Sequence, residues 1–334
     1  MSARGASHGL AIAWAPYSRR SRMFARELGV PLHCVAVRRP RGKLGAPVRY
    51  AVQTVRTAEL LFRRRPALVH VQNPPCFCGL VVAACCRITG ARYVLDHHSA
   101  SFLPIWRIVA PIQRVVVRGA ATNVVTTDRW ANVVRSWGGR AIVMRDAFHP
   151  LPEGSAADLG PGRHVAFVGT FAFDEPLAAV LAAARRLPAV RFHVTGDLAR
   201  APAGIEAAAP PNVTFTGFRS YQEYLGLLRA VDLVMALTTR DLTLQGAGCE
   251  AVSVGTPLVT SDWPYLREVF AGMVFTDATP EGIRRAVQEA LARRDELAVT
   301  VGALRDTRRR EWRSRFAELC SLVGAVPAPA PAAA

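Results

Sequence analysis

Short runs of β-branched and other apolar residues alternate with helical stretches over the second half of the sequence. Each run has the length of a strand, and each intervening stretch has the length and the apolar spacing of a helix. This alternation is typical of a parallel sheet with helices on both faces, which binds its ligands beyond the carboxyl ends of the strands. The strand-like runs are "HVAFVGTF" (164–171), "VRFHVTGD" (190–197), "NVTFTGF" (212–218), "DLVMALTT" (232–239) and "PLVTSD" (257–262).

The first half of the chain repeats this alternation less regularly, and a segment rich in proline and glycine follows at 149–163. A length of 334 residues suits two domains better than one core. We therefore predict an α/β protein with two Rossmann-like domains that face each other across a cleft. The predicted segments are a first domain at 1–150, a second domain at 151–305, a helix at 306–326 that packs back toward the first domain, and a disordered tail at 327–334.

The cysteines and the hydropathy of the chain indicate a cytoplasmic protein. Seven cysteines are an odd number and lack the paired spacing of zinc ligands, so we expect reduced thiols and no zinc site. The first residues, "MSARGASHGLAIAWAP", lack the apolar core of a secretion signal. No uncharged apolar run reaches the roughly 18 residues that a membrane-spanning helix needs.

Positive charge gathers in the first half of the sequence. Residues 1–150 hold 23 Lys and Arg against 5 Asp and Glu, whereas residues 151–334 hold 19 against 20. A basic half indicates an anionic partner, because clustered charge attracts opposite charge over a long range. We do not expect nucleic acid to be that partner, since no known binding module is present and few aromatic residues interleave the basic runs. An arginine-rich composition is the alternative explanation.

Several motifs follow one another between about residues 165 and 290: a strand ending in "VGTF", a strand ending in "TGD", "PNVTFTGF", an aromatic-rich helix and "EAVSVGTPLVTSD". This order resembles the nucleotide-sugar-binding half of GT-B glycosyltransferases, in particular the retaining family-four enzymes. The stretch "LTTRDLTLQGAGCEAVSVGTPLVTSDWPYLREVF" is similar to one bacterial branch of that family. Upstream, "QNPP", "DHHSASF" and "APYSRRSRMFARELG" are similar to its acceptor half with lower specificity.

The resemblance implies a metal-independent retaining glycosyltransferase that has no cofactor and uses a nucleotide-diphospho sugar as co-substrate. Its implied acceptor is a glycan or a lipid-linked glycan, in bacterial cell-surface polysaccharide biosynthesis. Together with the basic first half, this predicts a peripheral position on the anionic inner face of the plasma membrane. The alternatives are a GT-B epimerase, an inverting transferase and a non-catalytic protein that binds nucleotide sugars.

By the same resemblance, residues around a helix start at "LQGAG" (244–248) contact the donor. Backbone N–H groups at a helix start stabilise phosphate, and Gly246 and Gly248 would let the backbone approach it. Glu250 takes the place of the second glutamate of the family's E-x7-E motif and would accept hydrogen bonds from the ribose hydroxyls. The predicted donor-binding residues are Glu250, Gly169, Thr170, Asp197, Arg200, Phe218, Arg219, Thr243, Leu244, Gln245 and Gly246.

The position of the family's first glutamate holds Leu242, one residue after Asp241. Either the turn is one residue longer and Asp241 reaches the hydroxyls of the donor sugar, or the role of that acid is lost. Arg240 adjoins this turn, and its planar guanidinium suits phosphate oxygens. We predict Asp241 and Arg240 as catalytic residues, with ordinary turn and surface roles as the alternative.

Two further groups of candidate residues lie in the first half of the chain. Asp96 and His98, at a predicted strand end in "DHHSASF", are predicted to contact the acceptor or the transferred sugar and complete the catalytic set. Arg19 and Arg20 stand where the family commonly has a glycine-rich loop, so we predict that they bind donor phosphate or an anionic acceptor. The alternative is a basic helix face. No metal ligands are predicted.

Overall fold

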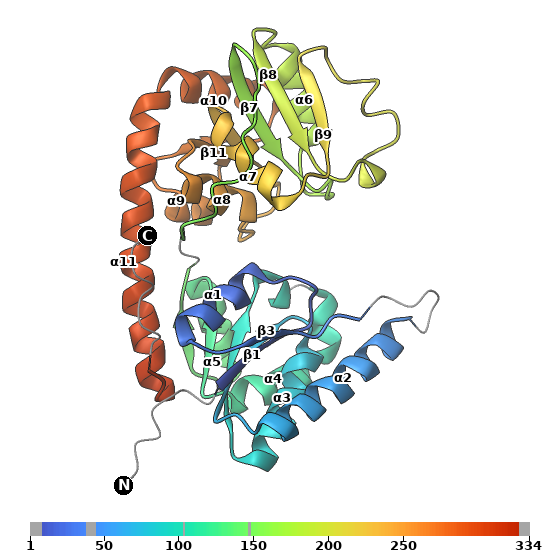
Figure 1. The fold of residues 1–334 in the computed structure, drawn as a ribbon, viewed down its shortest axis with the longest axis vertical. Coiled ribbons are helices and arrows are strands. Elements are labelled where there is room, and N and C mark those ends of the chain that lie inside the picture. The colour runs from blue at the N-terminus through green and yellow to red at the C-terminus, as the bar shows by residue number, and fades with distance from the viewer. Residues whose placement is uncertain (1–8, 38–44, 103, 146–147, 327–334) are drawn as a thin grey trace. The chain divides into compact units, whose positions relative to one another are not determined.

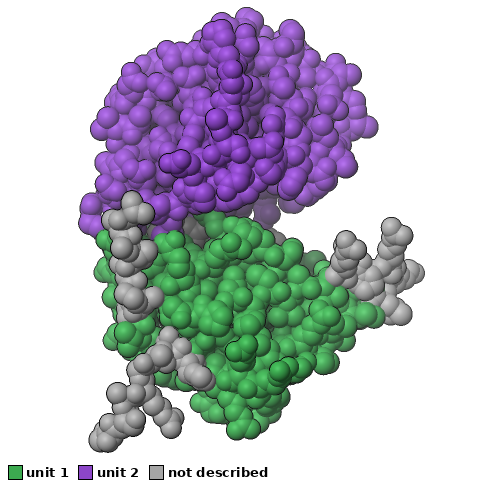
Figure 2. Space-filling model, in the orientation of Figure 1, with its two compact units in different colours: residues 1–146, 312–334 green, residues 147–311 purple. Residues whose placement is uncertain are grey.

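The computed structural model describes residues 9–37, 45–102, 104–145 and 148–326. It divides into two compact units, which Figure 2 distinguishes by colour. Unit 1 holds residues 1–146 together with 312–334, and unit 2 holds residues 147–311. The first boundary therefore falls four residues before the predicted one, and the end of the chain returns to unit 1.

Unit 1 contains a six-stranded sheet in the order β2-β1-β3-β4-β5-β6, and every strand pair in it is parallel (Figure 1). Parallel neighbours need crossover connections, and the intervening helices provide them. The strands are β1 (Gly9–Ala13), β2 (Leu32–Cys34), β3 (Leu68–Asn73), β4 (Arg92–His97), β5 (Thr122–Val125) and β6 (Ala141–Val143). The helices are α1 (Arg19–Leu28), α2 (Gly45–Arg64), α3 (Cys76–Thr89), η1 (Ser99–Phe102), η2 (Pro104–Val109), α4 (Ala110–Gly119) and α5 (Asp128–Ser136).

Unit 2 contains a second parallel six-stranded sheet, in the order β12-β11-β10-β7-β8-β9. Its strands are β7 (Arg163–Val168), β8 (Val190–Thr195), β9 (Val213–Gly217), β10 (Leu233–Ala236), β11 (Leu258–Ser261) and β12 (Val274–Thr276). Its helices are α6 (Leu177–Arg185), η3 (Leu198–Arg200), α7 (Tyr221–Ala230), α8 (Gly246–Val254), α9 (Pro264–Val269), α10 (Pro280–Ala292) and the first part of α11 (Arg294–Val323). Two Rossmann-like α/β sheets confirm the predicted fold class.

The core of each unit follows from burial on both faces of its sheet. All four residues of β10, "LVMA", are buried, as expected of a central strand whose two faces are covered by helices. All seven cysteines are free thiols, and burial accounts for six of them, whereas Cys34 is exposed. Cys78 lies in the core of unit 1, where desolvation raises the pKa of its thiol well above the usual value. The described cysteines form no disulfide, and the reducing compartment stays a prediction.

The chain ends in one long helix where the sequence analysis predicted a separate helix at 306–326. Helix α11 runs without a break from Arg294 to Val323, because it contains no proline and its one glycine, Gly302, lacks the positive φ that commonly ends a helix. From Trp312 onward it belongs to unit 1. There the rings of Trp312 and Phe316 lie 5.0 and 6.3 Å from the ring of Phe24, between centroids. The predicted tail at 327–334 lies outside the described residues.

The segment that opens unit 2 is anchored on α7. The Ser155 N–H donates to the Gln222 carbonyl oxygen at 2.9 Å. Gly226, one turn along the helix, is buried directly beneath Ser155, and a Cβ at Gly226 would overlap the Ser155 carbonyl oxygen. The close approach of two backbones therefore requires a glycine here.

We predict that Gly226→Ala destabilises unit 2 by about 1–3 kcal/mol, because two packed backbones must separate to admit one methyl group. Gly302→Ala is the matched control, since a Cβ at Gly302 in α11 would meet no atom within 4 Å. That change is expected to leave stability unchanged or raise it by about 0.5–1 kcal/mol. Urea unfolding followed by circular dichroism measures both, and equal stabilities of the two variants would contradict the prediction.

Candidate functional site

A cavity of about 370 Å³ lies at the carboxyl ends of β7, β8 and β9 in unit 2. Two strand ends turn through glycines with positive φ, 138° at Gly196 and 69° at Gly217, which keeps the backbone close to the cavity. The lining residues come from three loops and the start of α7. They are Val168, Gly169, Thr170, Thr195, Gly196, Asp197, Arg200, Gly217, Phe218, Arg219, Tyr221 and Tyr224.

The loops around this cavity are held by short polar contacts. The Glu175 carboxylate accepts hydrogen bonds from the N–H groups of Thr170 and Ala172, at 2.8 and 3.1 Å. The Thr170 hydroxyl donates to the same carboxylate at 3.1 Å. In the next loop, Asp197 caps η3 by accepting from the Ala199 N–H at 3.1 Å. The two loops are therefore ordered before any ligand arrives, which lowers the entropic cost of binding.

The lining of the cavity combines positive charge with an exposed aromatic ring. Arg200 and Arg219 are its cations, and Arg219 lies 3.9 Å from Glu223 at the exposed start of α7. The Phe218 side chain is 85% exposed, although an aromatic ring of this size is normally buried. A ligand with an anionic group and a flat ring would neutralise the first feature and cover the second.

Glu250 is linked to the cavity through Tyr224. The Tyr224 hydroxyl donates to Glu250 Oε2 at 2.8 Å, and Tyr224 lines the cavity. Glu250 lies in α8, whose start is fixed because Gln245 Nε2 donates to the Leu237 carbonyl oxygen just after β10. One predicted role changes: a Cβ at Gly248 would lie 2.8 Å from the Phe270 ring, so Gly248 is required for core packing and not for approach to a phosphate.

The turn before α8 is not part of this cavity, since none of its described lining residues comes from 240–246. Asp241 is exposed, and its carboxylate accepts from the Leu242 N–H at 2.7 Å. Leu242 has a φ of 56° and packs against the core of unit 2. The guanidinium of Arg240 lies 5.7 Å from the centre of the Phe173 ring. The structure therefore separates the predicted residues of this turn, and of Thr243 to Gly246, from those of the cavity.

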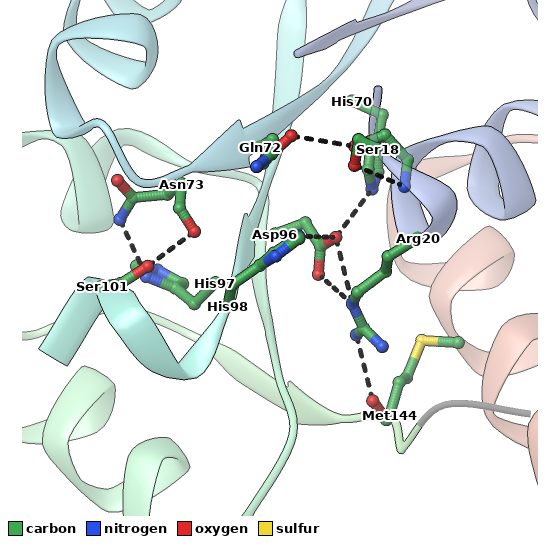
Figure 3. Close-up of polar contacts among 11 residues, drawn as sticks. Ser18, Arg20, His70, Gln72, Asn73, Asp96, His97, His98, Ser101 and Met144 are labelled. Carbon is green, nitrogen blue, oxygen red and sulfur yellow. Dashed lines mark hydrogen bonds and ion pairs between the residues drawn. The ribbon is translucent and has the colours of Figure 1, made fainter. Parts of the chain in front are cut away.

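Unit 1 holds a buried cluster of polar side chains at the carboxyl ends of β3 and β4 (Figure 3). Asp96 is fully buried, and Arg20 Nε donates to its two oxygens at 2.9 and 3.1 Å. Arg20 Nη2 also donates to the Met144 carbonyl oxygen at 3.0 Å. Arg20 is only 6% exposed, so it forms an internal ion pair, which differs from the predicted contact with a phosphate or an anionic acceptor. Arg19, the first residue of α1, is half-buried.

Two histidines lie near this ion pair, and a third, His97, belongs to the same polar cluster. His98 is 30% exposed, and its Nε2 lies 3.8 Å from Asp96 Oδ2, as does Nε2 of the buried His70. His97 contacts Asn73 through Nδ1 and Asn123 through Nε2, at 3.0 and 3.1 Å. Desolvation lowers the pKa of both His70 and His97 to about 4; the opposing effects are smaller, mainly the Asp96 charge for His70 and the Asn123 hydrogen bond for His97. The partly exposed His98 is thus the histidine through which this cluster reaches solvent.

The structure brings together six of the predicted donor-binding residues and leaves five outside. Gly169, Thr170, Asp197, Arg200, Phe218 and Arg219 line one cavity, and Glu250 is one hydrogen bond away. Sequence reasoning missed Tyr221 and Tyr224, although the aromatic residues of "YQEYLG" directly follow the strand end at 217 and were a usable signal. Asp96 and His98 lie together in unit 1, as expected for residues only two positions apart in the sequence.

Neither a metal cluster nor a membrane-spanning helix is found among the residues that the structure describes. No group of three or more His, Cys, Asp or Glu in the described ranges is arranged to hold a metal ion. The described helices include none with the length and apolarity required to cross a bilayer. This absence does not test metal independence, which stays a prediction.

Comparison with solved structures defines the class of fold. The chain matches sucrose-phosphate synthase from Thermosynechococcus elongatus with a TM-score of 0.68 and 15% identity, over 94% of this chain and 97% of that one. It matches HepE of Anabaena, in complex with UDP and glucose, with a TM-score of 0.62 and 15% identity over 93% and 91%. A glycosyltransferase from Rickettsia africae gives 0.67 and 12% over 94% and 98%. The chain has the GT-B fold of these proteins.

A comparison with family models finds a match within unit 2. Residues 162–293 match the family model of glycosyl transferases group 1. Comparison with curated proteins finds no match. The matched range covers the sheet of unit 2 and the whole cavity lining, and together with the fold it supports glycosyltransferase activity. Membership of the retaining family-four enzymes stays a prediction.

The buried histidines make unit 1 sensitive to acid. Below pH 6.5 an unfolded chain protonates His70, whereas the folded protein resists protonation until about pH 4. Stability therefore falls as the pH falls through this window, by an amount on the order of 3 kcal/mol for one histidine. We predict that His70→Leu loses less stability between pH 6.5 and pH 4 than the native chain. Urea unfolding followed by tryptophan fluorescence tests this, since five of the six tryptophans lie in unit 1; identical acid profiles would contradict it.

Proposed function

We propose that the protein is a retaining glycosyltransferase that moves a sugar from a nucleoside-diphospho donor to an acceptor without a metal ion. The observation that carries the proposal is the unit 2 cavity, where two arginines, an exposed phenylalanine and the Tyr224–Glu250 hydrogen bond meet at the carboxyl ends of three parallel strands. The match of this region to a glycosyltransferase family supports the same assignment.

Each feature of the cavity suits one part of such a donor. The ring of Phe218 stacks on the nucleobase, and Glu250, held by Tyr224, accepts hydrogen bonds from the ribose hydroxyls. Arg200 and Arg219 pair with the diphosphate, whose charge grows as the glycosidic bond breaks. Gly246, an exposed residue at the start of α8, offers its N–H as a further donor to that charge. Asp241 and Arg240, on the exposed turn before α8, are proposed to contact the transferred sugar and its phosphate.

The cluster in unit 1 has a second role in this proposal. His98 is proposed to contact the acceptor or the transferred sugar, because its imidazole is the exposed member of the cluster. Asp96 orients and polarises that imidazole. Arg20 is a positioning residue here, since its guanidinium holds the Asp96 carboxylate in place through a buried ion pair.

The decisive experiment is a screen of donor hydrolysis and transfer with UDP-, GDP- and ADP-sugars in the presence of EDTA. HepE was solved with UDP-glucose, so a UDP-sugar is the first donor to test. Turnover that survives EDTA, with a product of unchanged anomeric configuration, is expected. An inverted product would support an inverting transferase, a rearranged donor would support an epimerase, and binding without turnover would support a non-catalytic protein. Loss of activity that Mg²⁺ restores would overturn metal independence.

We predict that Glu250→Gln weakens UDP binding at least about tenfold, because hydrogen bonds to a charged acceptor contribute roughly 1.5–3 kcal/mol each. Tyr224→Phe should produce a smaller loss, since it removes only the group that orients the carboxylate. Glu289→Gln, at an exposed carboxylate on α10, is the matched control and should bind as the native protein does. Calorimetry measures all three, and an unchanged dissociation constant for Glu250→Gln would refute its role.

We further propose that the protein works at the anionic inner face of the plasma membrane, on a glycan or lipid-linked acceptor of cell-surface polysaccharide. The excess charge of residues 1–150 supports this, and Arg63, Arg64 and Arg65 at the end of α2 are all exposed. An arginine near such a surface contributes about 1 kcal/mol, and the contribution decays over a Debye length.

The expected result is salt-sensitive co-sedimentation with vesicles of anionic lipid and little with neutral ones. Changing Arg63, Arg64 and Arg65 to Ser should reduce it. The control removes the same charge from unit 2, by changing the exposed Arg185, Arg186 and Arg191 to Ser, and should have little effect. Equal recovery on neutral and anionic vesicles would leave the charge as a bias of composition.

A further inference from the structure

Unit 1 contains a second cavity, of about 230 Å³, at the carboxyl ends of β1, β2 and β3. Neither Arg20 nor Asp96 lines this cavity. Aromatic and proline rings form most of its wall, and two polar side chains of α2 complete it. The lining residues are Trp14, Pro16, Ala36, Val37, Arg49, Tyr50, Gln53, Pro74, Pro75 and Trp106.

The aromatic wall is rigid. The Trp14 indole N–H donates to the Thr57 hydroxyl at 2.9 Å, which fixes the ring. The rings of Trp14 and Tyr50 stack with centroids 6.1 Å apart, and the Tyr50 ring lies 5.2 Å from that of Phe77. Flat, immobile rings of this kind bind the C–H faces of a small ring at low entropic cost.

The two polar side chains are incompletely bonded. Gln53 is 3% exposed, and its Nε2 donates to the Val35 carbonyl oxygen at 2.6 Å. Among the described residues, however, the buried Gln53 Oε1 has no hydrogen-bond partner. Arg49 lies one turn earlier on the same face of α2, and its buried Nε likewise has no partner within the described ranges. Buried polar atoms are nearly always hydrogen-bonded, so these two indicate a ligand with one donor and one acceptor.

The charge of Arg49 specifies that ligand further. Its guanidinium lies 4.8 Å from the centre of the Tyr50 ring, and no acidic side chain of the described chain lies within 4 Å of it. A half-buried cation without a counter-ion favours an anionic ligand. The described lining contains no other charged residue.

We infer that this cavity binds an acidic sugar: a single hydroxylated ring whose anionic substituent pairs with Arg49, whose hydroxyl donates to Gln53 Oε1, and whose apolar face stacks on the aromatic wall. That the bound sugar is the acceptor rests on the transferase proposed above. The binding itself does not, because it involves unit 1 alone and needs no donor.

The test is calorimetric titration of the full chain with methyl glucuronide, glucose 6-phosphate and the neutral methyl glucoside. An acidic sugar should bind about tenfold more tightly than the glucoside, as one charge-assisted hydrogen bond predicts. The first two probes distinguish a carboxylate from a phosphate. Equal binding of acidic and neutral sugars, or binding of none, would overturn the inference.

Variants tie the binding to the cavity. Arg49→Gln should abolish the preference for acidic sugars, and Gln53→Leu should weaken all three. Gln113→Leu is the matched control, since Gln113 is also 3% exposed in unit 1 but does not line the cavity. This variant should bind all three sugars as the native protein does. Trp106→Ala, in the half-buried wall, tests the stacking face should Gln53→Leu fail to fold. A preference that survives Arg49→Gln would refute the proposed contact.

The outcome is separable from that of the proposed function. Donor hydrolysis without binding of acidic sugars would overturn only the present inference. Binding of acidic sugars without turnover of any nucleotide sugar would overturn only the transferase.

Discussion

Parallel pairing is the constraint on which both units depend. All ten strand pairs in the two sheets are parallel, so every strand of a sheet ends at the same edge. Residues far apart in the sequence, such as Gly169, Asp197 and Phe218, therefore meet without any contact between them having to be selected individually. The same rule places Trp14 and Pro74 side by side at the edge of unit 1. The chemistry of the protein is concentrated where the topology leaves loops free to vary.

The two edges use opposite physical strategies. In unit 2 the polar groups that face the cavity are partly solvated, and the loops are ordered by local bonds such as those of Glu175. In unit 1 the charges of Arg20 and Asp96 are withdrawn from water, at a desolvation cost that only their close pairing offsets. Removing either partner would leave a buried charge alone. The paired charges of the polar cluster thus fix the geometry of this edge.

The fold could be predicted well from the sequence, because strands and helices leave periodic patterns of apolar residues. Long alternating runs such as "HVAFVGTF" and "VRFHVTGD" define strands locally, and the glycines and aspartate at their ends mark the edge where ligands bind. Strand β12 is only three residues long and gives no comparable signal. The continuity of α11 was missed because a helix has no local mark where it passes from one unit to another.

Side-chain pairing was the least predictable part of the site. The burial of Arg20 depends on Asp96, which lies 76 residues further along the chain, and on the Met144 carbonyl. Nothing in the adjacent sequence distinguishes it from the half-buried Arg19. The separation of Asp241 from the cavity likewise follows from the positive φ of Leu242 and its packing against the core, which the spacing of a motif does not report.

The two glycines at the start of α8 differ in the space around them, although they belong to one motif. Gly248 faces Phe270 in the interior, so any larger side chain there would disturb the core, whereas a Cβ at Gly246 would enter open space. Gly246 therefore tolerates substitution, whereas Gly248, two residues later, does not. A side chain at Gly246 is compatible with the packing of unit 2, and under the proposed function this position is therefore open to changes that alter donor preference.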